Sequence, residues 1–263
     1  MIMTRSKTQQ MKEDRLSGLP DEILFIIMSF IMIKDAVKTC ILSKRWRNLW
    51  KFLPNLTLHS NDFRSHSVFF EFVSRILSCS DQNHTLHSLD FHGPFYGKPI
   101  VMTNLMGYAV YHNIQHLNIN VPYNISLSAR VFSCPSLKSL RISVSHNVLK
   151  RTRIPRSLEL PSLLSLHLDN VIISADENGH AEPFSNCKML NTLYIENCVL
   201  LPPHAFVGPK ILFISNASLT SLTMNFVYTC SFTTVISTPK ISSLAFDDPF
   251  WIVRGQKKEN AEV

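Results

Sequence analysis

The side chains in this sequence that are able to do chemistry are mainly histidines and cysteines, and their spacing fits neither catalysis nor metal binding. His112 and His116 have the i, i+4 spacing with which two imidazoles on a helix can hold one metal ion. Ile114, Leu117 and Ile119 around them indicate a strand instead. The six cysteines are never closer than 11 positions, so no C-x-x-C pair exists. We expect no metal site, and reduced, mostly buried thiols.

Motifs for phosphate binding and nucleophilic catalysis are missing from the sequence. The seven glycines form neither G-x-x-x-x-G-K-[ST] nor G-x-G-x-x-G, the loops that cradle phosphates. No G-x-S-x-G nucleophile motif occurs either. Among eleven histidines and many Ser and Asp residues, a chance Ser/His/Asp grouping is expected. We therefore expect no catalytic residues, no cofactor and no enzymatic activity.

The basic charge is concentrated near the N-terminus and does not form a broad nucleic-acid footprint. The net charge is +7, and the first 55 residues hold ten Lys and Arg against five Asp and Glu. The rest carries sixteen against fourteen. One local cluster remains, made of Lys150, Arg151, Arg153 and Arg156, for which a solvated loop is favoured over a phosphate site. We expect no nucleic-acid partner.

The most apolar run, "LPDEILFIIMSFIMI" from Leu19 to Ile33, resembles a targeting peptide only superficially. Asp21 and Glu22 precede its apolar part, no small-residue cleavage site comes after it, and the stretch from Ile23 is too short for the ~20 residues of a bilayer span. We expect a soluble intracellular protein, cytoplasmic and/or nuclear, with no membrane partner. Residues 1–13 and 251–263 are expected to be tails, the first of them disordered.

The same run has the period of a helix that must be covered on more than one side. Leu19, Ile23, Ile27 and Ile31 recur every four residues, and Pro20 suits a first helical turn. A second helical segment is expected from residue 35 onward, and the unit 14–54 is near the lower size limit for independent folding. Residues 55–80 are predicted to be a linker, with a helix over 63–77 that packs this unit onto the remainder of the chain.

Beyond residue 80 the sequence repeats the pattern L-x-x-L-x-[LIFM] seven times. The intervals between the central leucines are 28, 23, 26, 27, 29 and 22 residues, which fits the period of 20–29 of leucine-rich repeats. We therefore predict an α/β fold in which a small all-helical domain precedes a curved parallel sheet of about seven irregular repeats over 81–250. The central leucines are Leu89, Leu117, Leu140, Leu166, Leu193, Leu222 and Leu244.

Each predicted strand buries alternate side chains and presents the others to solvent. In "LNTLYIENC", Leu193 and Ile195 point inward and Tyr194 points outward, and Cys198 takes the Asn/Cys position of the repeat. Stacked strands therefore line up a mixed polar row that is a candidate recognition surface, although each residue in it is equally well explained as a solvated strand face. Its candidate target-binding members are Asp90, Asn118, Arg141, His167, Tyr194 and Thr223, together with Glu196 beside them.

The segment from Asp14 to Trp50 resembles an F-box of the plant F-box/leucine-rich-repeat (LRR) family of the FBD-associated type. The shared features are "DRLSGLPDEIL" at the start and "LSKRWRNLW" at the end, and phrases such as "LELPSLLSLHLDNV" extend the resemblance to about residue 250. Many members continue into a further C-terminal domain, whereas this sequence stops soon after "ISSLAFDDPFWIV". The resemblance implies no FBD domain in this chain.

The resemblance further implies that the F-box binds a Skp-type adaptor, which connects it to a cullin and a RING protein in an SCF ubiquitin ligase. The repeats would then bind the target protein that is ubiquitinated. By motif position, the adaptor-binding residues would be Leu16, Leu19, Pro20, Ile23, Leu24, Ile27, Ser43, Lys44, Arg45 and Trp46.

Three other functions remain open from the sequence. The chain could be a leucine-rich scaffold that binds protein without delivering ubiquitin, or a truncated family member without function. A small-molecule sensor is a further alternative, suggested by Arg141 and the cluster from Lys150 to Arg156. Seven repeats leave little room for an enclosed pocket, which disfavours that last alternative.

Overall fold

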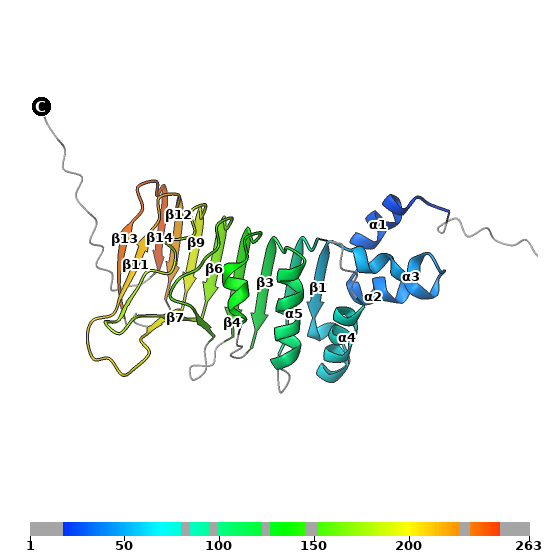
Figure 1. Ribbon diagram of the computed structural model, residues 1–263, viewed down its shortest axis with the longest axis horizontal. Helices are drawn as coiled ribbons and strands as arrows, with labels where there is room; N and C mark the ends of the chain where they lie inside the picture. The colour runs from blue at the N-terminus through cyan, green and yellow to red at the C-terminus, as the bar shows by residue number, and fades with distance from the viewer. Residues whose placement is uncertain are drawn as a thin grey trace, which may run out of the picture. The chain divides into compact units, whose positions relative to one another are not determined.

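A computed structural model describes residues 18–79, 85–94, 99–122, 127–145, 152–226 and 232–247. Leu16 and the segments predicted as tails, 1–13 and 251–263, lie outside these described residues. The chain divides into two compact units, 1–53 and 54–263. The backbone trace and the labels of both units are drawn in Figure 1.

The N-terminal unit contains helices α1 (Asp21–Ser29), α2 (Ile33–Lys38) and α3 (Trp46–Leu49), with 3₁₀ turns η1 (Thr39–Ile41) and η2 (Trp50–Phe52). Two acidic residues in the first turn of α1 favour its start, because carboxylates complement the positive end of the helix dipole. The helix predicted over the apolar run is present, but it ends at Ser29, before the end of the run. The Ser29 hydroxyl donates a hydrogen bond to the Ile26 carbonyl at this end. The small core of the N-terminal unit consists of Leu24, Met28, Ile33, Ala36, Trp46, Leu49 and Leu53.

The second unit is built on one eight-stranded parallel sheet, which confirms the predicted α/β repeat fold (Figure 1). The inward leucines of neighbouring strands stand directly opposite one another, as in the pairs Leu140–Leu166 and Leu166–Leu193. The strands in sheet order are β1 (Asn55–His59), β2 (Ser88–His92), β3 (His116–Val121), β4 (Ser139–Val144), β6 (Ser165–Asp169), β9 (Thr192–Glu196), β12 (Ser221–Asn225) and β14 (Ser243–Asp247).

The segment 55–80 is not a linker, and that prediction was wrong. Its first residues form β1, which pairs with β2 from Asn55 opposite Ser88 to His59 opposite His92. The helix predicted over 63–77 exists as α4 (His66–Ser78), capped by the Ser65 hydroxyl, which accepts a hydrogen bond from the Val68 amide. This strand and helix form the first repeat, because Leu56 and Leu58 are buried like the inward leucines of later strands.

The segments that return from one strand to the next form a second layer that changes from helical to extended along the chain. The first repeats use α4, α5 (Pro99–Tyr111) and the turn η4 (Ala129–Ser133). Later ones use two small parallel sheets. One contains β5 (Arg153–Ile154), β7 (Ile172–Ser174) and β10 (Val199–Leu201), and the other β8 (His180–Ala181), β11 (Ile211–Ser215) and β13 (Thr233–Ser237).

Buried asparagine and cysteine side chains donate to carbonyl groups near strand ends and in the turns between repeats. Asn170 Nδ2 donates to the Val144 carbonyl at 2.8 Å. Asn216 Nδ2 donates to the carbonyls of Phe184 at 3.1 Å and Cys187 at 2.9 Å. The Cys198 thiol, in the predicted Asn/Cys position, reaches the Leu168 carbonyl of the preceding repeat at 3.5 Å. These contacts add side-chain hydrogen bonds between neighbouring repeats, and a typical hydrogen bond contributes about 0.5–1.5 kcal/mol to stability.

Replacement of Asn216 by alanine tests the turn contacts. Asn216→Ala removes two hydrogen bonds to buried carbonyls, each of which keeps one backbone N–H donor, so the free energy of unfolding should fall by about 1–3 kcal/mol in urea denaturation. Asn191→Ala, at an exposed position, serves as the matched control and should change it by less than about 0.5 kcal/mol. Equal stability of the two variants would contradict this role.

Candidate functional site

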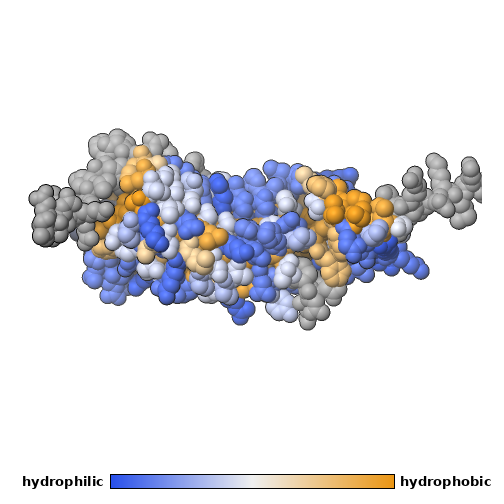
Figure 2. All heavy atoms as spheres, turned by 90° about the horizontal axis from the view of Figure 1, so that it is seen from above, coloured by the Kyte–Doolittle hydropathy of each residue, from blue (hydrophilic) through white to orange (hydrophobic). Residues whose placement is uncertain are grey.

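The N-terminal unit exposes an unusual number of large apolar side chains. The face of α1 opposite Leu24 and Met28, together with the turn after the helix, forms an apolar patch that appears in Figure 2 as orange spheres on this unit. Ile26 is 53% exposed and Phe30 84%. Soluble surfaces seldom gather such residues unless a partner covers them. The apolar patch consists of Ile23, Ile26, Phe30, Ile31 and Met32, and Ile41 and Leu42 are exposed later in the same unit.

An ion pair connects the start of α1 to the segment before α3. Arg45 Nε donates to Asp21 Oδ1 at 2.8 Å, and Arg45 Nη2 contacts the same oxygen at 2.5 Å. The two residues are 24 positions apart in the chain. Because both side chains are partly exposed, we expect the pair to orient the two segments rather than to contribute much stability.

The outward side chains of the large sheet form the aligned rows that the repeat spacing predicts. Asp90 lies opposite Asn118, and Asn118 opposite Arg141. The same level continues through His167, Tyr194 and Thr223 on β6, β9 and β12. The structure also adds Thr57 of β1 to the row, which the repeat pattern did not predict because it missed that strand.

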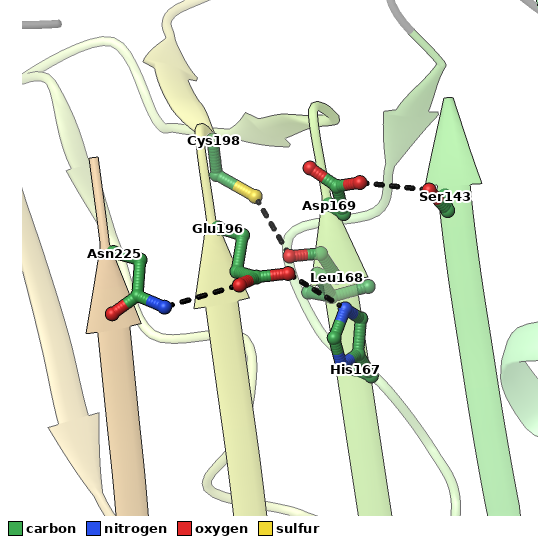
Figure 3. A network of polar contacts seen from close by, with 7 residues as sticks. All are labelled: Ser143, His167, Leu168, Asp169, Glu196, Cys198 and Asn225. Carbon is green, nitrogen blue, oxygen red and sulfur yellow. Dashed lines mark hydrogen bonds and ion pairs between the residues drawn. The ribbon is translucent and has the colours of Figure 1, made fainter. Parts of the chain in front are cut away.

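Two groups of hydrogen bonds link these outward side chains across strands. Near the start of the sheet, Asp90 Oδ1 accepts from Asn118 Nδ2 at 2.8 Å and Asp90 Oδ2 lies 3.3 Å from His59 Nε2. Near its middle, Glu196 lies 3.0 Å from His167 Nε2 and accepts from Asn225 Nδ2 at 3.1 Å (Figure 3).

Two further contacts complete the middle group. Asp169 accepts from the Ser143 hydroxyl at 2.7 Å (Figure 3). The Tyr194 ring stacks on His167 with centroids 5.4 Å apart and an interplanar angle of 28°. We name the group of Arg141, Asp169, His167, Tyr194 and Glu196 the central cluster.

Comparison with known proteins assigns both units. The F-box domain family matches residues 16–58. The family described as "FBD-associated F-box protein At5g56370, LRR repeats" matches residues 107–261, which is more than half of the chain. The chain belongs to the plant F-box/LRR family of the FBD-associated type.

Three curated relatives of this F-box/LRR protein, all from Arabidopsis thaliana, show the extent of the similarity. The chain is 30% identical over 187 residues to FBD-associated F-box protein At3g52670, covering 70% of this chain and 44% of the relative. It is 33% identical over 217 residues to F-box/FBD/LRR-repeat protein At5g22660, covering 80% and 45%. F-box/LRR-repeat protein 13 is 29% identical over 192 residues, covering 70% and 41%. The chain thus spans less than half the length of these relatives.

The adaptor-binding residues suggested by motif position divide between the core and the surface of the F-box. Leu24 and Trp46 are buried, so they serve the core in this conformation. Pro20, Ile23 and Lys44 are exposed, whereas Leu16 lies outside the described residues. The other four, which are half-buried, are Leu19, Ile27, Ser43 and Arg45. Motif position did not identify the exposed Ile26, Phe30, Ile31 and Met32.

Burial lowers the pKa of His167 in the central cluster below its usual value of 6.5. The Arg141 guanidinium lowers it further, while the carboxylates of Glu196 and Asp169 oppose the shift. Burial also lowers the pKa of His116, with smaller contributions from His87 and Lys138. Near neutral pH the His167 ring is therefore uncharged, with its Nε2 atom 3.0 Å from a Glu196 carboxylate oxygen.

Within the described residues, no group of three or more His, Cys, Asp or Glu side chains is arranged to hold a metal ion. Cys40, Cys79, Cys134, Cys187 and Cys198 are free thiols, and three of them are buried. Burial raises the pKa of the Cys187 thiol to about 11, which keeps it protonated and unreactive. Across the same described parts, none of the helices has the length and apolar character needed to cross a membrane.

The lowered pKa of His167 predicts a pH dependence of stability. Below pH 6.5 the unfolded chain takes up a proton that the folded His167 resists, so the free energy of unfolding falls as the pH drops. His167→Gln retains a donor toward Glu196 but cannot titrate. Its loss of stability between about pH 7.5 and pH 5 in urea denaturation should be smaller than in the unmodified protein.

His204→Gln, at an exposed position on a loop, is the matched control. It should behave like the unmodified protein across the same pH range. A pH response of His167→Gln as steep as that of the control would exclude this contribution of His167.

Proposed function

We propose that this F-box/LRR protein is the substrate-recognition subunit of an SCF-type ubiquitin ligase. In this proposal the F-box binds a Skp-type adaptor, which connects it to a cullin and a RING protein, and the repeats bind a target protein for ubiquitination. The chain itself is noncatalytic and acts in the cytoplasm or the nucleus. The observation that carries the proposal is the apolar patch on a unit that belongs to the F-box family.

The energetics of the apolar patch favour a protein partner over exposure to water. Complete burial of a large aliphatic or aromatic side chain contributes roughly 1.5–3 kcal/mol, and association costs about 4–15 kcal/mol. The five residues of the patch are 36–84% exposed, so each still has surface that a partner can bury. Together they offset a large part of the association cost. Tight binding then requires additional contacts, for which the exposed Ile41 and Leu42 are the nearest candidates in the chain.

The sheet supports target binding for a different reason. Its outward positions lie on parallel strands with a fixed register, so polar side chains are held at regular spacing on a rigid element. Arg and Tyr, the types most enriched in interface anchors, are represented by Arg141 and Tyr194, both of them exposed. The face is therefore suited to select a partner through specific polar contacts.

Substitutions in the apolar patch test adaptor binding. Ile23→Asp with Ile26→Asp places two charges where the adaptor would bury apolar surface, so the dissociation constant should rise about hundredfold or more. Both positions are exposed, so the fold should be retained, which circular dichroism can verify. Val207→Asp introduces the same chemical change at a fully exposed position of the second unit and should leave adaptor binding intact. Equal adaptor binding by the patch variant and the control would refute this location.

Reconstitution distinguishes a ligase subunit from a leucine-rich scaffold that is not coupled to ubiquitin. The full chain, co-expressed with a Skp-type adaptor, should retain a cullin and RING protein in a pull-down, and this retention should be lost with Ile23→Asp/Ile26→Asp. Addition of ubiquitin, its activating and conjugating enzymes and ATP should then modify proteins bound to the repeats. A chain that binds the adaptor but never recruits the cullin would instead support the scaffold.

A further inference from the structure

The central cluster places two carboxylates side by side, and its one cation, Arg141, is paired with neither of them in the part of the chain that the structure describes. Asp169 of β6 lies directly opposite Glu196 of β9 in the parallel register, and neighbouring strands are about 4.8 Å apart. Like charges at opposed positions are unfavourable in a sheet. Among the described residues, no ion pair joins Arg141 to either carboxylate. The structure therefore holds a locally negative position in a chain whose net charge is +7.

Hydrogen bonds orient these carboxylates without neutralising them. Asp169 accepts from the Ser143 hydroxyl and Glu196 accepts from the Asn225 amide, while His167 Nε2 lies 3.0 Å from Glu196. Serine and asparagine are uncharged, and His167 is uncharged near neutral pH because its pKa lies below the usual value. The Glu196 side chain remains 30% exposed. These hydrogen-bonding partners thus add no positive charge beside the carboxylates, and they hold both side chains at fixed positions on the sheet.

The surrounding face excludes one class of partner and suits another. The outward positions of the seven described strands from β1 to β12 in the large sheet contain no Leu, Ile, Val, Met or Phe, so an apolar helix would find no apolar surface there. Tyr194, 36% exposed, is the next outward residue before Glu196 on β9. An aromatic ring beside carboxylates is a favourable environment for a cation.

We propose that the sheet face over β4, β6 and β9 binds a basic segment of the target protein, with a Lys or Arg side chain seated between Asp169 and Glu196 and against Tyr194. This inference rests on the proposed function, because it names the chemistry of the partner that the repeats select. The occupant is polar and cationic, which matches both the charge of the position and the lack of apolar side chains around it.

Arg141 limits which residues the bound segment can carry next to the seated cation. It lies at the same level as His167 and Tyr194, one level away from the two carboxylates. Its exposed guanidinium repels a second cation next to the first, so a bound segment should carry a neutral or acidic residue there. Removal of this charge should therefore strengthen the binding of segments with consecutive basic residues, whereas removal of the carboxylates should weaken it.

The experiment is a selection of displayed random 12-residue peptides on the full chain, purified with and without its adaptor. The enriched peptides should contain Lys or Arg, and their binding should weaken with added salt. Asp169→Asn with Glu196→Gln should weaken the enriched peptides about tenfold or more. Arg141→Gln should strengthen those with adjacent basic residues. Glu177→Gln with Glu182→Gln removes two exposed carboxylates away from this sheet and should change binding less than twofold.

Four outcomes would overturn the inference: enrichment of acidic or apolar peptides, no enrichment of any class, basic peptides that bind the Asp169→Asn/Glu196→Gln variant as well as the unmodified chain, or an equal loss with the Glu177→Gln/Glu182→Gln control. Adaptor copurification is measured on every variant. A chain that never retains the adaptor but binds basic peptides through Asp169 and Glu196 would refute the proposed ligase function and leave this site intact. A chain that retains the adaptor but selects no class of peptide would refute this site and leave the proposed ligase function intact.

Discussion

Burial of paired inward side chains is the constraint on which the second unit depends. A strand such as β6 has only two inward leucines, Leu166 and Leu168, and cannot exclude water from them alone. They become fully buried because β4 and β9 place equivalent side chains on either side and the return segments cover them from behind. Since the period of side-chain direction is two, this burial also fixes the register. The polar rows on the outward face are therefore a direct consequence of the apolar rows inside.

The parallel arrangement creates a second requirement, which the turns meet. Parallel neighbours need long crossovers, and each crossover buries carbonyl groups that lie outside the strand ladder. Asn216 donates to two such carbonyls in the preceding repeat, while Asn170 and Cys198 donate to carbonyls near the ends of the strands β4 and β6. Asn170 also adopts a left-handed backbone with φ 56°, which asparagine tolerates better than most residues. A few side chains can thus support crossovers of different length and structure, and the repeat spacing remains irregular.

Much of the sheet could be predicted from the sequence, because the signal for it is periodic. Seven central leucines and the neighbours of each outward residue could be assigned from alternation and spacing alone. The strand β1 was missed although "LPNLTL" matches the repeat pattern, since Leu56 precedes Leu89 by 33 residues, more than the usual period. The longer interval accommodates α4. The helix α5 was missed because apolar residues lie on all its faces, from the buried Leu105 to the exposed Ile100.

The candidate sites were less predictable for a related physical reason. In α1, apolar residues also occur on every face, so the period cannot distinguish the side that forms the core from the side that forms a surface. Only the packing of the folded unit buries Leu24 and leaves Ile26 and Phe30 exposed. On the sheet, alternation identified Tyr194 and Glu196 as outward neighbours of His167 and Asp169. Their stacking and hydrogen bonds depend on side-chain rotamers, which spacing does not determine.

The two surfaces differ in the kind of association that each can support. The apolar patch offers area whose burial is non-directional and scales with size, which suits a lasting partner that shields it from water. The sheet face offers fixed charges, hydrogen-bonding groups and one exposed aromatic ring, which discriminate strongly between partners but provide little apolar area. In the proposed function this difference matches the two tasks of a substrate receptor. A stable contact holds the chain in the ligase, and a selective contact that dissociates readily allows one target after another to be modified.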